Sequence, residues 1–592
     1  MNRLKFIIMS LLVIAAIQLV ALLGLTFVFY QVTPNGVLAR DTFIGRIQPV
    51  LLFARLADRS LNVLYRGPKA PGDIPLYQID IATEELVKLD AEIAKLDVFL
   101  EDDAKFWIPA TFRANGETYD VEMHIRGDRF NHWQFRKKSW RVKFKKDHLF
   151  RGMREISLII PEDRGWFAEL FNSYRAEKLG LLQPPMRVVG VSLNGSKSLA
   201  YIEVEHWTKE MLEKQGRPGD VNFYKTGGVQ TSVFNGWDPI FDDMAYWGKF
   251  TKSVVSPHDS YEELDALFSI MKPGAHTQPG FRAQVDTLFD VQQLVRWYAH
   301  SMLSGNLHAG GDNIRLLFDP SRGRFEPIPW DVFLIPPRSL LVAPGNPLWD
   351  EVFAIPEWNL ALHRFLWEYV TNEDQVKDDL READRLRAMV EELAYRDPIK
   401  LPSNRQVKHD LDNRIRDIRA NIEFLKEQLQ ISEVLVTQRI PTDAEQAQGV
   451  DLVLDVTVRG PVAAQLSGLA LPLALVQDSV FSILRDDGDG QFNAADMPLS
   501  FERTEGLQAD QYAFFPEHAF LAPKQPETDG VGMPVTTPQT HHLFFLTGLR
   551  RVAARDLPIL LDVRNAVTGQ PAQVIHTTVV DERVFQDSFP AL

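Results

Sequence analysis

Two oxygen-bearing side chains flank a predicted hairpin over residues 314–330. IRLLF is strand-like, DPSRG carries turn residues, and FEPIPW can return antiparallel, although its prolines confine it to a sheet edge. The flanking residues Asn313 and Asp331 would then face each other, with Cβ atoms roughly 5 Å apart. An amide oxygen beside a carboxylate suits Mg²⁺. Two other partners for Asp331 remain open: a turn that it caps, or a cation such as Arg315 or Arg338.

A histidine and a basic strand add further candidates. In protein kinases an Asn and a later Asp, separated by a strand pair, hold the metal ions that bridge ATP phosphates. The kinase base lies five residues before that Asn, and here this position holds His308. Residues 135–146, FRKKSWRVKFKK, include seven basic residues and no acidic one. Such a strand can present Lys143 or Lys138 to phosphate, or it is a solvated edge strand protected by its charges.

A second oxygen-rich segment, RDDGDGQFNAAD, spans residues 485–496. Its carboxylates and amide have calcium-loop spacing, although Arg485 occupies the first ligand position and no bidentate Glu ends the loop. The alternative is an acidic β-turn. The candidate Ca²⁺ ligands are Asp487, Asp489, Asn493 and Asp496.

The length, net charge and cysteine content of the chain limit which partners and chemistry it can use. The chain has 592 residues, too many for one core, so two or three domains are expected. Its net charge of -15 argues against nucleic acid as the main partner. With no cysteine, thiolate catalysis, cysteine-ligated zinc and disulfides are excluded.

The N-terminus predicts a membrane anchor. An uncharged apolar run extends from Phe6 to Tyr30, about 25 residues, enough for roughly 37 Å of helix. No small-residue cleavage site follows, so we expect a single-pass signal anchor. Arg3 and Lys5 favour a cytoplasmic N-terminus and an extracytoplasmic bulk, in the periplasm or at the cell surface, although four arginines between residues 40 and 59 weaken that charge bias.

The predicted class is α+β, with four segments along the chain. Residues 1–30 form the transmembrane anchor and 31–75 a juxtamembrane connector. Residues 76–435 mix strands and helices, with hairpin turns at Asn115-Gly116 and Asn194-Gly195. Residues 436–592 hold short strand-like runs and predict an all-β, sandwich-like domain.

In order along the chain, several motifs resemble the spore coat protein H (CotH) kinase family of atypical protein kinases. HIRGDRF with RKKSWRVKF is similar to the family's Arg-Gly followed by a Lys-Lys-Ser strand. VVGVSLNGSKSLAYIEVEHWTKEML looks like its Asn-Gly hairpin, glutamate and helix, and NFYKTGG like the Tyr-Lys that follows. DNIRLLFDPSRGRFEPIPWD resembles its Asn-containing strand, turn and Pro-Trp-Asp. The resemblance covers roughly residues 76–430.

This resemblance implies a bilobal, kinase-like domain that binds ATP and Mg²⁺ and phosphorylates a protein hydroxyl. By the resemblance, Asn313 and Asp331 are the metal ligands, Lys143 or Lys138 contacts phosphate, and Glu205 lies near the nucleotide. The expected function is a membrane-anchored kinase acting on an envelope or surface protein.

Two departures from the family pattern favour an alternative function. The family's acid upstream of the Asn is replaced by His308, so either His308 or the neighbouring Asp312 would have to act as the base. The family's second acid after Pro-Trp-Asp is replaced by Phe333. The alternative is a non-catalytic envelope scaffold with a degenerate kinase-like domain.

Overall fold

The structure is a computed structural model of the full chain. It describes Val13, Gln18 and residues 58–65, 67–69, 73–93, 106–127, 132–133, 137–226, 244–251, 260–306, 314–339, 341, 346–472, 482–487, 490–505, 511–516, 520–521, 527–528, 534–535, 539–546, 559–580 and 583–587.

Seven strands form a closed barrel, ordered β1-β2-β3-β4-β5-β7-β6. Both predicted Asn-Gly turns are confirmed: residues 115–116 join β2 to β3, residues 194–195 join β6 to β7, and both residues of each turn have positive φ, as a tight hairpin turn requires. The barrel interior is packed with aromatic and β-branched side chains. The strands are Leu76–Asp80, Ile108–Ala114, Glu117–Ile125, Trp140–Phe144, Glu155–Ile159, Met186–Leu193 and Leu199–Glu205 for β1 to β7.

The predicted hairpin around Asp331 is confirmed. Strands β10 (Arg315–Asp319) and β11 (Arg324–Ile328) pair antiparallel, with Arg315 opposite Ile328. They belong to a four-stranded sheet ordered β11-β10-β8-β9, with β8 at Asn222–Thr226 and β9 at Trp247–Thr251. The proline-bearing strand β11 lies at the edge of this sheet, as expected of a strand that lacks ladder donors.

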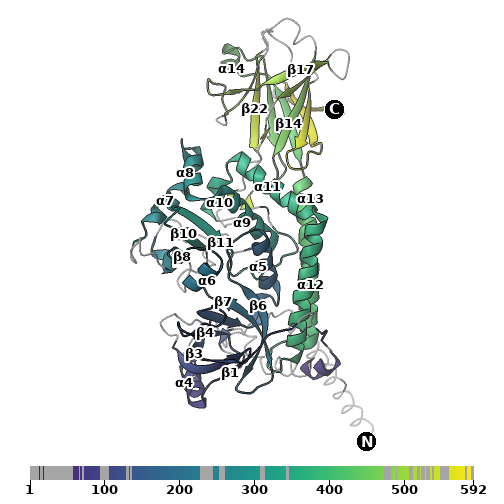
Figure 1. The fold of residues 1–592 in the computed structure, drawn as a ribbon. Coiled ribbons are helices and arrows are strands. Elements are labelled where there is room, and N and C mark those ends of the chain that lie inside the picture. The colour runs from purple at the N-terminus through teal and green to yellow at the C-terminus, as the bar shows by residue number, and fades with distance from the viewer. Residues whose placement is uncertain are drawn as a thin grey trace.

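Helices pack around this second sheet and share one large apolar core with it. Their amphipathic sequences bury one face and expose charges on the other. Two long antiparallel helices, α12 and α13, run along the side of the molecule (Figure 1). The helices of eight residues or more are α5 at Ala168–Lys178, α7 at Glu262–Ile270, α8 at Phe281–Leu288, α9 at Val291–Ser304, α11 at Pro356–Thr371, α12 at Glu373–Arg396 and α13 at Asn404–Gln430, besides α4 at Thr83–Ile93 beside the barrel.

The C-terminal part is all-β apart from the short helix α14 (Asp443–Ala447). It starts with β12 at Glu433, directly after α13. Seven strands form one sheet, ordered β16-β15-β22-β13-β12-β24-β25, and five form another, in which β14 pairs with β18, β19 and β23, and β17 with β18. Apolar side chains of both sheets share a third core. The main strands are β12 at Glu433–Arg439, β13 at Leu452–Val458, β14 at Ala464–Pro472, β15 at Ser482–Arg485, β16 at Met497–Pro498, β17 at Phe501–Glu505, β18 at Gln511–Pro516, β19 at Phe520–Leu521, β22 at Gln539–Leu546, β23 at Leu560–Asn565, β24 at Gln573–Val580 and β25 at Arg583–Asp587.

The mixed α+β class with several sheets is therefore confirmed. The predicted anchor, Phe6–Tyr30, lies outside the described residues except for Val13 and Gln18. Among the residues that the structure describes, no helix is long and apolar enough to cross a membrane.

Candidate functional site

Asp331 lies directly after the hairpin, and its carboxylate forms an ion pair with the Arg164 guanidinium. Its side chain is 21% exposed, so a ligand can reach it. Its φ of 57° is in the left-handed region, which Asp tolerates better than most residues but which still costs about 1 kcal/mol. A strained, half-exposed carboxylate at the end of a hairpin is a common feature of functional sites.

Arg164 is an ion-pair partner of Asp331 that the sequence did not indicate. It ends the short helix η4 (Pro161–Arg164) and is 3% exposed. Its Nε lies 3.2 Å from Asp163 Oδ2 and 3.3 Å from Glu169 Oε2, so one guanidinium binds three carboxylates.

The two arginines considered from the sequence have aromatic neighbours in the structure. The Arg315 guanidinium lies 5.2 Å from the centre of the Trp330 ring, and its Nη1 donates to the carbonyl of Thr226 at 3.2 Å. The guanidinium of Arg338 lies 5.7 Å from the Phe424 ring centre.

The backbone after Asp331 is held by α5 and the turn before it. Asn172, fully buried on α5, donates to the carbonyls of Val332 at 2.9 Å and Leu334 at 2.8 Å. Gly165, with φ of 57°, approaches so closely that a Cβ there would lie 2.5 Å from the Phe333 carbonyl oxygen. These contacts fix both the position and the direction of the Asp331 carboxylate.

A further polar contact connects this site to the barrel. His132 Nε2 lies 3.3 Å from Asp163 Oδ2, and His132 Nδ1 lies 3.0 Å from the hydroxyl of Ser139, just before β4. Gly127, after β3, lies against the His132 ring, since a Cβ there would come within 2.2 Å of it. The segment between β3 and β4 is therefore tied to Arg164 through Asp163.

Where the barrel meets the second sheet, cationic side chains gather beside this network. Partial burial lowers the pKa of His206 well below its ordinary value, and repulsion from four neighbouring cations adds to the effect. Burial, with repulsion from Arg164 and Arg141, also lowers the pKa of the Arg126 guanidinium to about 9. So many crowded cations favour a multiply charged anion between them. We call the four cations around His206 the cationic cluster: Arg126, Arg141, Lys225 and Arg315.

The lysines singled out from the sequence lie on the barrel with partners of their own. Lys138 donates to the Trp133 carbonyl at 3.1 Å and lies 3.8 Å from Asp90. Lys143 lies 3.9 Å from Glu122, and its Nζ is 5.1 Å from the Trp107 ring centre. Arg141 on the same strand belongs to the cationic cluster, and its Nη1 lies 3.5 Å from Glu155 Oε2.

Glu205 ends β7 and is 1% exposed, with Lys214 Nζ donating to both its oxygens at 2.8 and 2.9 Å. His308, Asp312 and Asn313 lie outside the described residues. The roles of these four residues, and of Lys138 and Lys143, therefore stay predictions.

Sequence reasoning missed Arg164 and the cationic cluster. The signal for Arg164 was the stretch EDRGWFAE, in which three consecutive charged residues and a glycine stand between an apolar strand and a helix. Arg141, Lys225 and Arg315 lie on β4, β8 and β10, and Arg126 directly follows β3, so no local spacing brings the cluster together.

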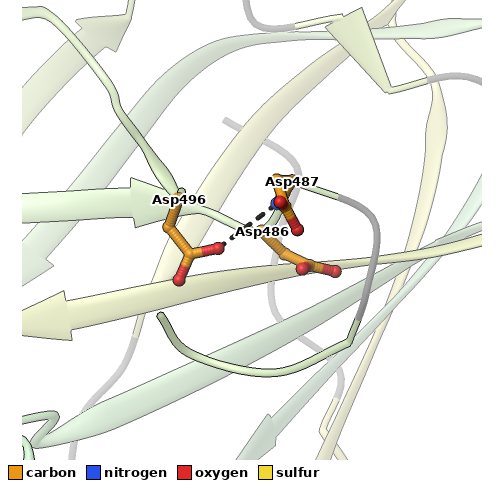
Figure 2. Close-up of side chains that lie close together, drawn as sticks. All are labelled: Asp486, Asp487 and Asp496. Atoms are coloured by element: carbon orange, nitrogen blue, oxygen red, sulfur yellow. Dashed lines mark hydrogen bonds between the residues drawn. The ribbon is translucent and has the colours of Figure 1, made fainter. Parts of the chain in front are cut away.

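The acidic loop before β16 brings three carboxylates together. Asp486, Asp487 and Asp496 each offer an oxygen within 4.8 Å of the others (Figure 2). Backbone amides partly satisfy Asp496: Asp487 N donates at 3.3 Å and Asn493 N at 2.8 Å. Burial and the neighbouring acids nevertheless raise the Asp496 pKa. The structure adds Asp486 to the predicted ligands, and the predicted Asp489 lies outside the described residues.

Comparison with known proteins supports the predicted resemblance. Residues 123–334 match a family model described as CotH kinase protein. The chain is 26% identical over 267 residues to the inner spore coat protein H of Bacillus subtilis (strain 168), covering 44% of this chain and 69% of that protein. It also matches the crystal structure of a Helicobacter pylori proinflammatory kinase, CtkA, at 12% identity and a TM-score of 0.21, covering 49% of this chain and 93% of that one.

Proposed function

We propose, from the premise that residues 123–334 form a CotH-type atypical kinase domain, that the protein transfers the γ-phosphoryl group of ATP to a hydroxyl of an envelope protein. In this proposal the barrel is the N-terminal lobe of a bilobal kinase-like domain. The second sheet and its helices are the C-terminal lobe, and the nucleotide binds where the two meet.

One observation carries the proposal: the cationic cluster lies beside the Asp331–Arg164 pair at the junction of barrel and second sheet. Phosphoryl transfer needs positive charge around the phosphates and a carboxylate that holds the metal ion. Residues 123–334 contain a candidate for each, and this supports the proposal.

The chain's own residues fit Mg²⁺, because carboxylate and amide oxygens are the ligands it prefers. Asp331 and Asn313 would hold the ion, which would neutralise charge developing on the transferred phosphoryl group. Arg164 orients the Asp331 carboxylate, and the cationic cluster binds the phosphate oxygens. His308 or Asp312 accepts the proton of the attacking hydroxyl as its oxygen bonds to the γ-phosphorus and the bond to the β-phosphate oxygen breaks.

Calorimetric titration of the full chain with Mg-ATP, combined with a phosphoryl-transfer assay, tests this function. Mg-dependent ATP binding with transfer supports the kinase. The alternative, a non-catalytic envelope scaffold with a degenerate kinase domain, is favoured by the positions of His308 and Phe333. ATP binding without transfer to any hydroxyl, or no binding at all, would establish that alternative.

Removing one cation of the cluster should weaken nucleotide binding. Because a hydrogen bond to a charged group contributes about 1.5–3 kcal/mol, we expect Arg141→Gln to raise the Kd for Mg-ATP about tenfold or more. Lys145→Gln, on the same segment but paired with Asp120 at 2.9 Å outside the cluster, is the matched control and should bind like wild type. Equal affinity of the Arg141 variant and the control would exclude Arg141 from the phosphate site.

We infer that the kinase works at a membrane, held by the apolar run Phe6–Tyr30, with its bulk on the extracytoplasmic side. An envelope or surface protein is then the substrate within reach. The family match supports neither the membrane anchor nor the side of the membrane on which the bulk lies. Flotation of the full chain with liposomes tests the anchor, and protease protection tests the side.

We also infer that the acidic loop binds Ca²⁺ through Asp486, Asp487 and Asp496, because their oxygens lie within 4.8 Å of one another and carboxylate oxygens are the ligands that Ca²⁺ prefers. Calcium at a hundred times its Kd should stabilise the fold by about 2.7 kcal/mol. Asp487→Asn with Asp496→Asn should abolish the calcium-dependent rise in melting temperature. Absence of any rise in the wild-type protein would show that the loop is only an acidic turn.

A further inference from the structure

One short segment of the protein exposes its apolar side chains and turns its polar side chains toward the rest of the protein. The 3-10 turn η1 (Leu61–Leu64) presents three apolar side chains outward: Leu61 is 47% exposed, Val63 82% and Leu64 73%. The polar residues of the same segment, Asp58 and Asn62, turn inward instead.

The inward side is firmly attached to the start of α13. Asp58 accepts from the Ser403 hydroxyl at 2.5 Å and from Arg405 Nε at 3.1 Å, and Asn62 accepts from the backbone amide of Asn404 at 2.8 Å. The Tyr65 ring packs edge-on against Tyr395, with ring centres 6.2 Å apart. The exposed apolar side chains are therefore held on a fixed surface.

This surface lies at one end of the molecule. Residues 58–65 sit at the foot of α12, and the sheets of β14, β17 and β22 lie at the opposite end (Figure 1). Along the chain, the turn follows the 25-residue uncharged run ending at Tyr30. The connector of residues 31–75 carries six Lys and Arg against three Asp, a net +3 in a chain of net charge -15. Basic residues near a membrane are attracted to anionic headgroups.

We propose that Leu61, Val63 and Leu64 insert into the interfacial layer of a lipid bilayer and fix the orientation of the kinase domain on the membrane. An element with its polar side on protein and its apolar side outward matches an apolar outer medium. The inference rests on the membrane anchoring included in the proposed function. By its attachment to α13, it would also hold the C-terminal sheets away from the membrane, since a 27-residue helix extends roughly 40 Å.

The chain has no cysteine, so single reporters can be placed without background. Full-length Val63→Cys, carrying an environment-sensitive fluorophore, is reconstituted in vesicles of phosphatidylcholine and phosphatidylglycerol containing nitroxide-labelled lipid. We expect a blue-shifted emission that the nitroxide lipid quenches roughly twofold. The matched control is Ile440→Cys, 46% exposed and next to α14 at the far end, which should show neither effect.

The possible outcomes test this inference separately from the proposed membrane-anchored kinase function. If the full chain fails to float with vesicles, both the anchoring and this inference are wrong. If it floats but the Val63 label is unquenched, or is blue-shifted without quenching because protein covers it, only the inference is wrong. ATP binding and phosphoryl transfer in detergent are measured on the same variants, so a failed kinase function is recognised separately.

Discussion

Asp331→Asn should reduce phosphoryl transfer by about 10³-fold or more while the protein remains folded. A bridging metal neutralises charge on the transferred phosphoryl group, and loss of the carboxylate removes its anionic ligand. Asn keeps the shape and also tolerates the φ of 57° at this position. Arg164 keeps Asp163 and Glu169, so we expect a loss of only about 1–2 kcal/mol in the free energy of unfolding.

The matched control is Asp319→Asn, the same substitution at the other end of the same hairpin. Asp319 Oδ1 accepts from Ser321 N at 2.9 Å, and the amide oxygen of Asn can retain this bond. Its transfer rate should equal that of wild type. If Asp331→Asn instead melts much earlier yet binds Mg-ATP like wild type, Asp331 is a structural partner of Arg164 and the magnesium assignment is wrong.

The local parts of this site could be predicted from the sequence. The hairpin followed from its Asp-Pro and Gly turn, and the edge position of β11 from its two prolines, because both depend on backbone restrictions within a few residues. The Asn-Gly turns of the barrel followed in the same way. In each case the structure depends on the φ that a residue can adopt.

The partners of Asp331 could not be predicted, because they are long-range. Arg164 reaches Asp331, and Asn172 reaches the backbone after it, only once η4 and α5 pack beside the second sheet. Arg141 of the barrel and Lys225 of the second sheet both lie near His206 only because barrel and sheet pack together. Hydrophobic periodicity can indicate a helix, but it does not say which helix covers which strand. The alternation on β4 also did not distinguish Arg141 from Lys143, since both point to the same face.

In the acidic loop, too, the sequence did not identify every candidate ligand. The spacing indicated Asp487 and Asp496, and the structure brings both within reach of Asp486. The calcium-loop pattern gave no reason to choose Asp486. Its inclusion depends on the fold, which buries it to 8% exposure after β15.

Arg164→Met should produce the largest loss of stability of the substitutions in residues 123–334, about 3–5 kcal/mol. The guanidinium is 3% exposed and neutralises Asp331, Asp163 and Glu169 together. Without it, Glu169, which is 5% exposed, is left as a buried carboxylate that lacks its cation. Thermal melts of the variant and wild type measure the loss, and equal melting temperatures would show that Arg164 does not stabilise the fold.

Arg164→Lys separates positioning from stability. Lysine keeps the charge but lacks the planar guanidinium that forms ion pairs with all three carboxylates, so Asp331 loses its fixed direction. We expect kcat to fall about 10–100-fold, as for other residues that orient metal ligands, with little change in the KM for ATP. The cluster variant Arg141→Gln should show the opposite pattern, a raised KM. If Arg164→Lys folds normally and keeps the wild-type kcat, Arg164 stabilises the fold alone, and Asp331 needs no fixed orientation for the reaction.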